Sequence, residues 1–205
     1  MSKKLDIVAI LDRSGSMSNM VTELVGGFNR IIEEHKDKDA KVSVAIFDDE
    51  WELIYNRKKI TKIPELTVSD VSPRGCTALF DAIGKTVNVV DEKIKKSKTS
   101  KPDKVIVLII TDGLENASKE FKQDVIKKLV EDKKKEDYEF IFLGANIDSF
   151  TEAGGLGIDA KRTSNYDGTH CGMTRALDAA SSAVMFCALD KDYNLSDVYN
   201  QTGEE

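Results

Sequence analysis

Five oxygen-bearing side chains stand in three separate short segments of the 205-residue chain. They are Asp12, Ser14 and Ser16 in the string DRSGS, Thr77 in GCTALFD, and Asp112 in TDG. Carboxylate and hydroxyl oxygens are hard ligands of the kind that Mg²⁺ prefers, and Mg²⁺ keeps several waters when a protein supplies few ligands. Each string alone is also typical of a polar turn. A cation site therefore requires that the three segments converge.

Nitrogen and sulfur ligands are scarce in this sequence. The two histidines, His35 and His170, are far apart, and none of the three cysteines forms a C-x-x-C pair. These counts exclude a disulfide framework and a cysteine-rich zinc site, and they suit a reducing compartment. We interpret Cys76, beside Thr77, as a residue with a packing or incidental role rather than a redox one. Cys171 follows His170 at a predicted helix start, where a thiol pKa is lowered, but no third group identifies a nucleophile.

Apolar patterns predict the elements that must position the five residues. Continuous apolar runs indicate buried strands at residues 5–11, 42–47, 105–110 and 140–143, and an alternating run indicates an edge strand at 51–60. Helical periodicity begins at Val21, Leu79, Phe121 and Met173. This alternation predicts an α/β domain with a mostly parallel sheet, one antiparallel edge strand and helices on both faces.

Smaller features refine this prediction. Ser16 or Ser18 is expected to cap the first helix, and Gly26 and Gly27 within it indicate close packing. The acidic run 48–50 is expected to be a hairpin turn rather than a second cation site. A short last strand is expected near residues 160–164. We expect one domain over residues 1–190 and a polar C-terminal tail, 191–205, that is frayed or forms a strap over the surface.

The predicted strands bring the polar segments to one edge. Asp12 directly follows the first strand, Asp112 follows the third, and Thr77 lies at the start of the second helix. Open α/β sheets bind ligands at the carboxyl ends of their strands, where the connecting loops gather. The sequence therefore predicts one oxygen-lined site at this edge.

The five residues resemble the metal-ion-dependent adhesion site (MIDAS) of the von Willebrand factor A (vWA) domain family, over roughly residues 5–189. The resemblance implies a three-layer, doubly wound, Rossmann-like fold. It implies that Ser14, Ser16 and Thr77 ligate a divalent cation directly, and that Asp12 and Asp112 act mainly through water. The expected cation is Mg²⁺, with Mn²⁺ or Ca²⁺ as alternatives. An open position on the cation would bind an acidic side chain of a partner protein.

Three neighbouring residues could act on this site. Asp81, one helical turn after Thr77, either hydrogen-bonds a metal-bound water or is an exposed helix carboxylate. Glu115 and Asn116 follow the TDG turn and are interpreted as residues that tune the metal site; Asn116 has the alternative role of capping the third helix.

Charge and hydropathy exclude several classes of partner. The net charge is −6 and only six of the 30 basic residues are Arg, which argues against nucleic acid. The N-terminus lacks the pattern of a signal peptide, and the longest strongly apolar run, 105–110, is far below the ~20 residues that span a bilayer. We expect a cytoplasmic protein that resembles the intracellular, bacterial-type members of the family. Its oligomeric state is left open.

Three functions compete. The leading one is a non-enzymatic, cation-dependent protein-binding module. A metal-dependent phosphohydrolase is the first alternative, but the chain has no P-loop, and Ser14 stands where that chemistry needs a second acid. The second alternative is a metal-independent scaffold that binds through the lysine-rich stretch from Lys93 to Lys104, a stretch equally typical of a solvated helix end.

Overall fold

The computed structural model describes residues 3–97 and 100–202, and in these ranges six strands form one sheet. The strands are β1 (Leu5–Asp12), β2 (Ala40–Phe47), β3 (Trp51–Lys59), β4 (Lys104–Thr111), β5 (Tyr138–Ala145) and β6 (Thr163–Tyr166). Their order is β3-β2-β1-β4-β5-β6, with β3 antiparallel to β2 and every other pair parallel. The predicted mostly parallel sheet with an antiparallel edge strand is confirmed.

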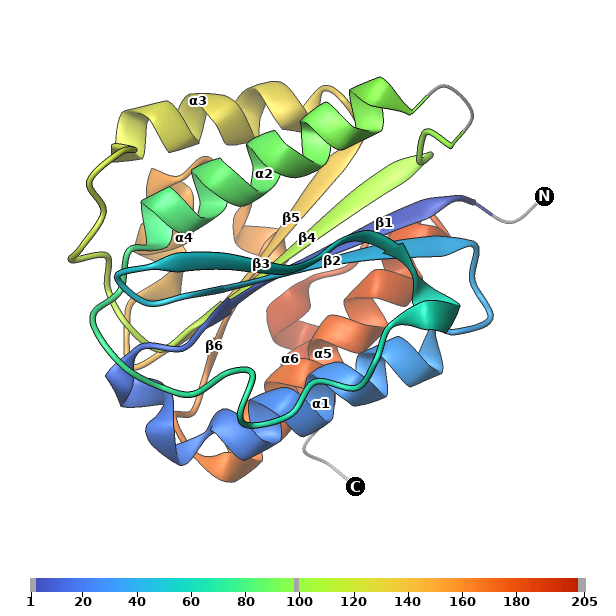
Figure 1. Cartoon of the computed structure of the whole chain (residues 1–205). Helices are drawn as coiled ribbons and strands as arrows, with labels where there is room; N and C mark the ends of the chain where they lie inside the picture. Colours follow the sequence, from blue (N-terminus) through green and yellow to red (C-terminus); the bar gives the residue numbers. More distant parts are fainter. Residues whose placement is uncertain (1–2, 98–99, 203–205) are drawn as a thin grey trace.

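Helices cover both faces of this sheet (Figure 1). One layer holds α1 (Val21–Glu34), α5 (His170–Ala188) and α6 (Leu195–Gln201), and the other holds α2 (Leu79–Lys96), α3 (Gln123–Lys134) and α4 (Ser149–Gly155). Successive residues of a strand point to opposite faces, so Ile7 and Leu11 join the core under α1 and α5, while Val8 and Ile10 join the core under α2. Burial on both faces is why β1 and β4 are continuous apolar runs in the sequence.

The start of the first helix differs from the prediction. Residues Gly15–Asn19 form a 3₁₀ helix, and α1 begins only at Val21, without a side-chain cap. The hydroxyl of Ser18 instead donates to the carbonyl of Gly15, and that of Ser16 turns toward the strand ends. The prediction of a serine cap was therefore wrong, because both hydroxyls are engaged before the α-helix starts.

The two helical glycines have different environments. A Cβ on Gly27 would lie 2.3 Å from Cδ1 of Leu177 on α5, so close packing is confirmed there. A Cβ on Gly26 would meet nothing within 4 Å, and close packing is wrong for that residue. The crossing of α1 and α5 therefore depends on Gly27.

Several short elements complete the fold. The last strand is β6, at Thr163–Tyr166 rather than 160–164, because Ala160–Arg162 form a 3₁₀ helix. Within the stretch predicted as a polar tail, 191–205, the described part contains α6, whose Leu195 and Tyr199 are buried against the core. This part of the tail therefore covers the core as a strap.

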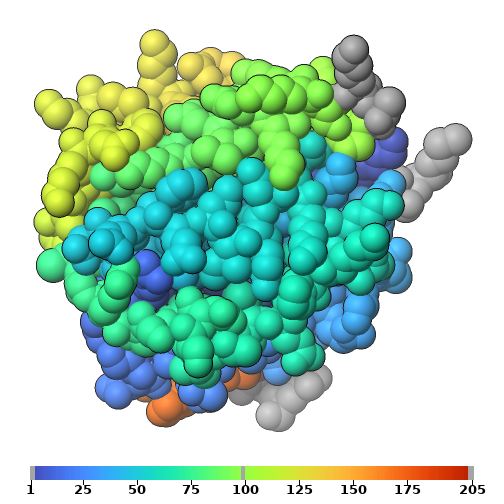
Figure 2. Space-filling view, in the orientation of Figure 1, coloured from blue at the N-terminus to red at the C-terminus, as the bar shows by residue number. Residues whose placement is uncertain are grey.

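The segment after β3 crosses the α1 side of the molecule. Figures 1 and 2 show residues 60–78 running below β3, and the amide of Asn29 in α1 bonds both backbone groups of Leu66. This path returns the chain to the carboxyl edge of the sheet, where α2 begins. In residues 3–97 and 100–202, no helix is long and apolar enough to cross a membrane.

Candidate metal site

The carboxyl ends of β1 and β4 lie side by side, because Leu11 pairs with Ile110 in parallel register. Asp12 and Asp112 therefore stand at the same edge of the sheet. The hydroxyl of Thr111 donates to Oδ2 of Asp12 at 2.6 Å, and the backbone N–H of Ser14 donates to Oδ1 at 2.6 Å. Both oxygens of this fully buried carboxylate are thus engaged by the strand-end loops.

A chain of hydroxyls joins the two carboxylates. The Oγ atoms of Ser14 and Ser16 lie 3.1 Å apart, and Oγ of Ser16 donates to Oδ1 of Asp112 at 2.5 Å. Ser14 and Asp112 are buried, whereas Ser16 is exposed at the mouth of the site. Four of the five predicted ligands are therefore in one hydrogen-bonded cluster that opens to solvent.

Thr77 reaches the cluster from a separate loop. Its backbone N–H donates to Oδ1 of Asn116 at 2.9 Å, and the N–H of Asn116 donates back to its carbonyl at 3.0 Å. A Cβ on Gly113 would lie only 2.9 Å from Oγ1 of Thr77, so the Thr77 hydroxyl packs directly against the TDG turn. The N–H of Gly15 donates to the carbonyl of Gly75, which joins this loop to the DRSGS loop. The structure thus brings all five residues together.

The electrostatics of the cluster favour a cation. Burial, and secondarily the charge of Asp112, raise the pKa of Asp12 to about 6, although hydrogen bonds from Thr111 and Ser14 oppose the shift. Burial also raises the pKa of Asp112, against the bond from Ser16. Within the described residues, neither carboxylate forms an ion pair with a lysine or arginine, and Arg13, the sequence neighbour of Asp12, pairs with Asp48 and Glu52. Two buried carboxylates without an ion-pair partner, together with three hydroxyls, are a donor set that fits a hard divalent ion.

Arg13 lies in the DRSGS string, but its guanidinium pairs with acids outside the cluster. Its Nε is 3.2 Å from Asp48 and its Nη1 is 3.5 Å from Glu52. Asp48 is fully buried and also accepts from Nε of Arg74 at 2.7 Å. The acidic run 48–50 is the turn between β2 and β3, as predicted, and its buried carboxylate keeps Arg13 away from the cluster.

Asp81 and Glu115 hold the loop that frames the site. The carboxylate of Asp81 accepts N–H groups of residues 119–121 at 2.8–3.0 Å. Burial opposes its ionisation, but these bonds prevail, and the pKa of Asp81 is lowered. Glu115 accepts the N–H groups of Phe80 and Ser118 at 2.9 and 2.7 Å. Sequence spacing identified both acids but not their partners.

Asn116 orients the Thr77 backbone and does not cap the third helix, which begins at Gln123. Its interpretation as a helix cap was wrong, because six residues, 117–122, separate it from that helix. Asn116 is the residue that sequence reasoning undervalued, and its place three residues after Gly113 of TDG was the available signal.

In the described part of the chain, no histidine or cysteine side chain is hydrogen-bonded to the five residues of the cluster. His35 is buried, with Nε2 3.1 Å from the carbonyl of Ser181, and Nδ1 of the exposed His170 is 2.8 Å from Glu23. Cys76 and Cys171 are exposed. Within the described ranges, no group of three or more His, Cys, Asp or Glu side chains could hold a metal. A site built largely from hydroxyls is consistent with that result.

The fold and the position of the cluster define a class of protein: a three-layer α/β domain with polar loops at the carboxyl edge of its sheet. No family model and no curated protein matches the sequence. Solved structures match the fold of this chain, and they include vWA-type domains. The chain therefore has the vWA fold.

Three of these structures show the range of the likeness. The vWF domain of the pilus tip protein Mfa5 from Porphyromonas gingivalis has a TM-score of 0.68 and 10% identity, over 91% of this chain and 96% of that one. Mussel proximal thread matrix protein 1 with a zinc-occupied MIDAS motif has a TM-score of 0.64 and 15% identity, over 91% and 46%. Manganese-loaded TRAP from Plasmodium vivax has a TM-score of 0.59 and 17% identity, over 81% and 69%. This chain thus spans less than half of the mussel protein.

Proposed function

We propose that this chain is a non-enzymatic protein-binding module whose partner is held through a divalent cation at the carboxyl edge of the sheet. The observation that carries the proposal is the hydrogen-bonded cluster of Asp12, Ser14, Ser16 and Asp112 with Thr77 packed against it. These groups come from three loops, and the cluster opens to solvent at Ser16.

The ligands have distinct roles in this proposal. The hydroxyls of Ser14, Ser16 and Thr77 bind the ion directly, and Asp12 and Asp112 act mainly through bound water. The two hydrogen bonds that Asp12 already accepts support an orienting role for its carboxylate. Because the direct protein ligands are neutral, the bound ion keeps enough charge to attract one more anion. That anion is an acidic side chain of the partner protein.

We propose Mg²⁺ as the ion, because the donors are all hard oxygens. The zinc-occupied MIDAS of the mussel protein and the manganese-loaded form of TRAP support a divalent cation on this fold. Mn²⁺ and Ca²⁺ are the alternatives. We also propose that the protein acts in a bacterial-type cytoplasm, which suits the exposed free thiols of Cys76 and Cys171.

Calorimetric titration of the metal-free protein with Mg²⁺ and Mn²⁺ tests the site. We expect one cation per chain, and loss of binding in the double variant Asp12→Ala, Thr77→Ala. The matched control is Thr67→Ala, Asp70→Ala, because these residues form an exposed hydrogen-bonded Thr–Asp pair outside the site. Cation binding that survives in the first double variant would exclude this site.

Capture of partners from a native extract tests the second half of the proposal. Capture of the partner should require the cation. We therefore expect that EDTA abolishes capture, and that the double variant Asp12→Ala, Thr77→Ala captures no partner. Capture that is indifferent to EDTA would favour the metal-independent scaffold instead. The phosphohydrolase has no supporting observation here: the strand-end loop places a serine hydroxyl at position 14, hydrogen-bonded to Ser16, and not an acid.

A further inference from the structure

A cavity lies at the edge of the sheet opposite the candidate metal site, where β1 and β2 begin and β3 ends. Its volume is about 240 Å³. The lining residues are Lys4, Leu5, Asp6, Asp39, Lys41, Arg57, Lys59, Ser100, Lys101 and Pro102. The eight residues of β1 separate it from the metal site by roughly 25 Å. It is therefore independent of the cation cluster.

A buried, charge-neutral pair of Arg57 and Asp6 lines this cavity. Arg57 has a left-handed backbone (φ +50°), and its N–H donates to the hydroxyl of Ser43 at 2.9 Å. Its guanidinium is paired with Asp6, and the side chains of this pair are only 2% and 3% exposed. The guanidinium also donates to the carbonyl of Ser100 at 2.8 Å, which ties the segment 100–103 before β4 to this pair. Asp6 is thus already neutralised by Arg57.

The walls carry an excess of positive charge. Lys4, Lys41, Lys59 and Lys101 come from four different segments, and within the described residues none of them forms an ion pair with a carboxylate. The ammonium of Lys41 donates to the hydroxyl of Ser100. Burial and the charge of Arg57 lower the pKa of Lys41, against the attraction of Asp6 and Asp39. Because Asp6 is paired with Arg57, Asp39 is the only remaining carboxylate among the lining residues.

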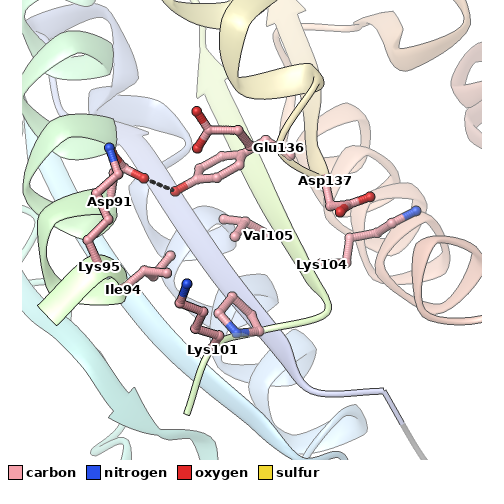
Figure 3. A pocket seen from close by; sticks show the side chains of 10 residues that line it. Asp91, Ile94, Lys95, Lys101, Lys104, Val105, Glu136 and Asp137 are labelled. Carbon is pink, nitrogen blue, oxygen red and sulfur yellow. Dashed lines mark hydrogen bonds and ion pairs between the residues drawn. The ribbon is translucent and has the colours of Figure 1, made fainter. Parts of the chain in front are cut away.

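The neighbouring pocket does not carry this excess of positive charge. It shares Lys101 and Pro102 with the lysine-lined cavity, and Figure 3 shows its side chains. There Lys95 lies 2.8 Å from Asp91, and Lys104 lies 3.2 Å from Asp190. Glu136 and Asp137 also line that pocket, so its lysines are balanced by acids.

We infer that the cavity of Lys4, Lys41, Lys59 and Lys101 binds a phosphate group. Lysines bind phosphate as point charges, and a multiply charged anion matches several unpaired ammonium groups better than a single carboxylate. The hydroxyl of Ser100 adds a neutral donor. The volume is below the ~300 Å³ at which pockets begin to enclose whole drug-sized ligands, so it suits a single charged group. Lys98, the remaining basic residue of this loop, lies outside the described residues.

Calorimetric titration with pyrophosphate, in EDTA and at low salt, tests the inference. We expect one pyrophosphate per chain, and affinity at least about tenfold weaker in Lys41→Gln, Lys101→Gln. The matched control is Lys122→Gln, Lys128→Gln, which removes the same charge from exposed residues beside and within α3. An equal loss of pyrophosphate affinity in both double variants, with unchanged thermal midpoints, would show that binding depends only on the overall charge of the protein. That result would overturn the inference.

Flotation with vesicles distinguishes the source of the phosphate. Vesicles of phosphatidylcholine with phosphatidate present it as a headgroup, and pure phosphatidylcholine is the control. If binding that needs Lys41 and Lys101 occurs only on the phosphatidate vesicles, the ligand is a lipid headgroup. If it occurs only with pyrophosphate, the ligand is a soluble phosphate. Failure of both probes would refute the site. Because EDTA is present, neither result depends on the proposed cation.

Discussion

The buried carboxylate of Asp12 allows a quantitative test through the substitution Asp12→Asn. In the folded chain its pKa is raised from the ordinary value of 3.8 to about 6, first by burial and also by Asp112. A shift of about two units corresponds to about 3 kcal/mol, at roughly 1.4 kcal/mol per unit. In the metal-free protein at neutral pH, the ionised Asp12 therefore lowers the free energy of unfolding by about that amount.

The pH dependence has a definite sign. As the pH falls from about 6 to 3.8, the folded chain takes up the Asp12 proton before the unfolded chain does, and this destabilisation disappears. In EDTA near pH 8, Asp12→Asn should raise the free energy of unfolding by up to about 3 kcal/mol. The difference should vanish as the pH falls below 3.8, where Asp12 is protonated in both the folded and the unfolded chain. The Asn side chain can still accept from the N–H of Ser14.

Urea unfolding in EDTA and in Mg²⁺ measures both effects. Saturating Mg²⁺ should stabilise the wild type by about 2.7 kcal/mol at a hundredfold excess over Kd and leave the variant unchanged. The control Asp70→Asn removes an exposed carboxylate and should change stability by no more than about 0.5 kcal/mol. If Asp12→Asn is less stable than the wild type in EDTA near pH 8, or if its effect is independent of pH, the reasoning fails.

Two further predictions concern the fold that supports the site. Gly27→Ala should lower the free energy of unfolding by about 1–3 kcal/mol through overlap with Leu177, whereas Gly26→Ala, in open space, should raise it by about 0.5–1 kcal/mol. Urea unfolding measures both changes, and changes of the same sign would contradict the α1–α5 packing. Burial lowers the pKa of His35 from 6.5, so the unfolded chain binds its proton first and stability should fall as the pH drops below about 6.5. His35→Gln should flatten that part of the stability profile, and an unchanged slope in this variant would assign it to another group.

The main elements could be predicted because burial leaves a clear sequence pattern. β1 and β4 are covered by helices on both faces, so their residues are almost all apolar. The predicted ends were short where a strand finishes on a polar residue, as at Asp12 and Thr111. The helices α4 and α6 were missed, because each is only seven residues long and buries few side chains. Such segments carry too little periodicity to be distinguished from loops.

The candidate site could be predicted only in part. The types of Asp12, Ser14, Ser16, Thr77 and Asp112, and their places at strand and helix ends, are readable from the chain. The roles of Asp81 and Asn116 are not, because their partners lie 35 or more residues away and are backbone groups with no sequence signature. Whether the cluster binds the proposed cation stays a prediction.

The sequence by itself determined which chemistry is available: a chain with two separated histidines and no cysteine pair has to use oxygen to bind a metal. The tertiary structure decided where charge is left uncompensated. Arg13 is adjacent to Asp12 in sequence, yet it pairs with Asp48, which leaves the cluster of Asp12 and Asp112 without an ion-pair partner among the described residues. Lys4, Lys41 and Lys101 are far apart in sequence, yet the order β2-β1-β4 brings them to one cavity. Sheet order depends on how whole faces pack, and no local pattern in the chain records it.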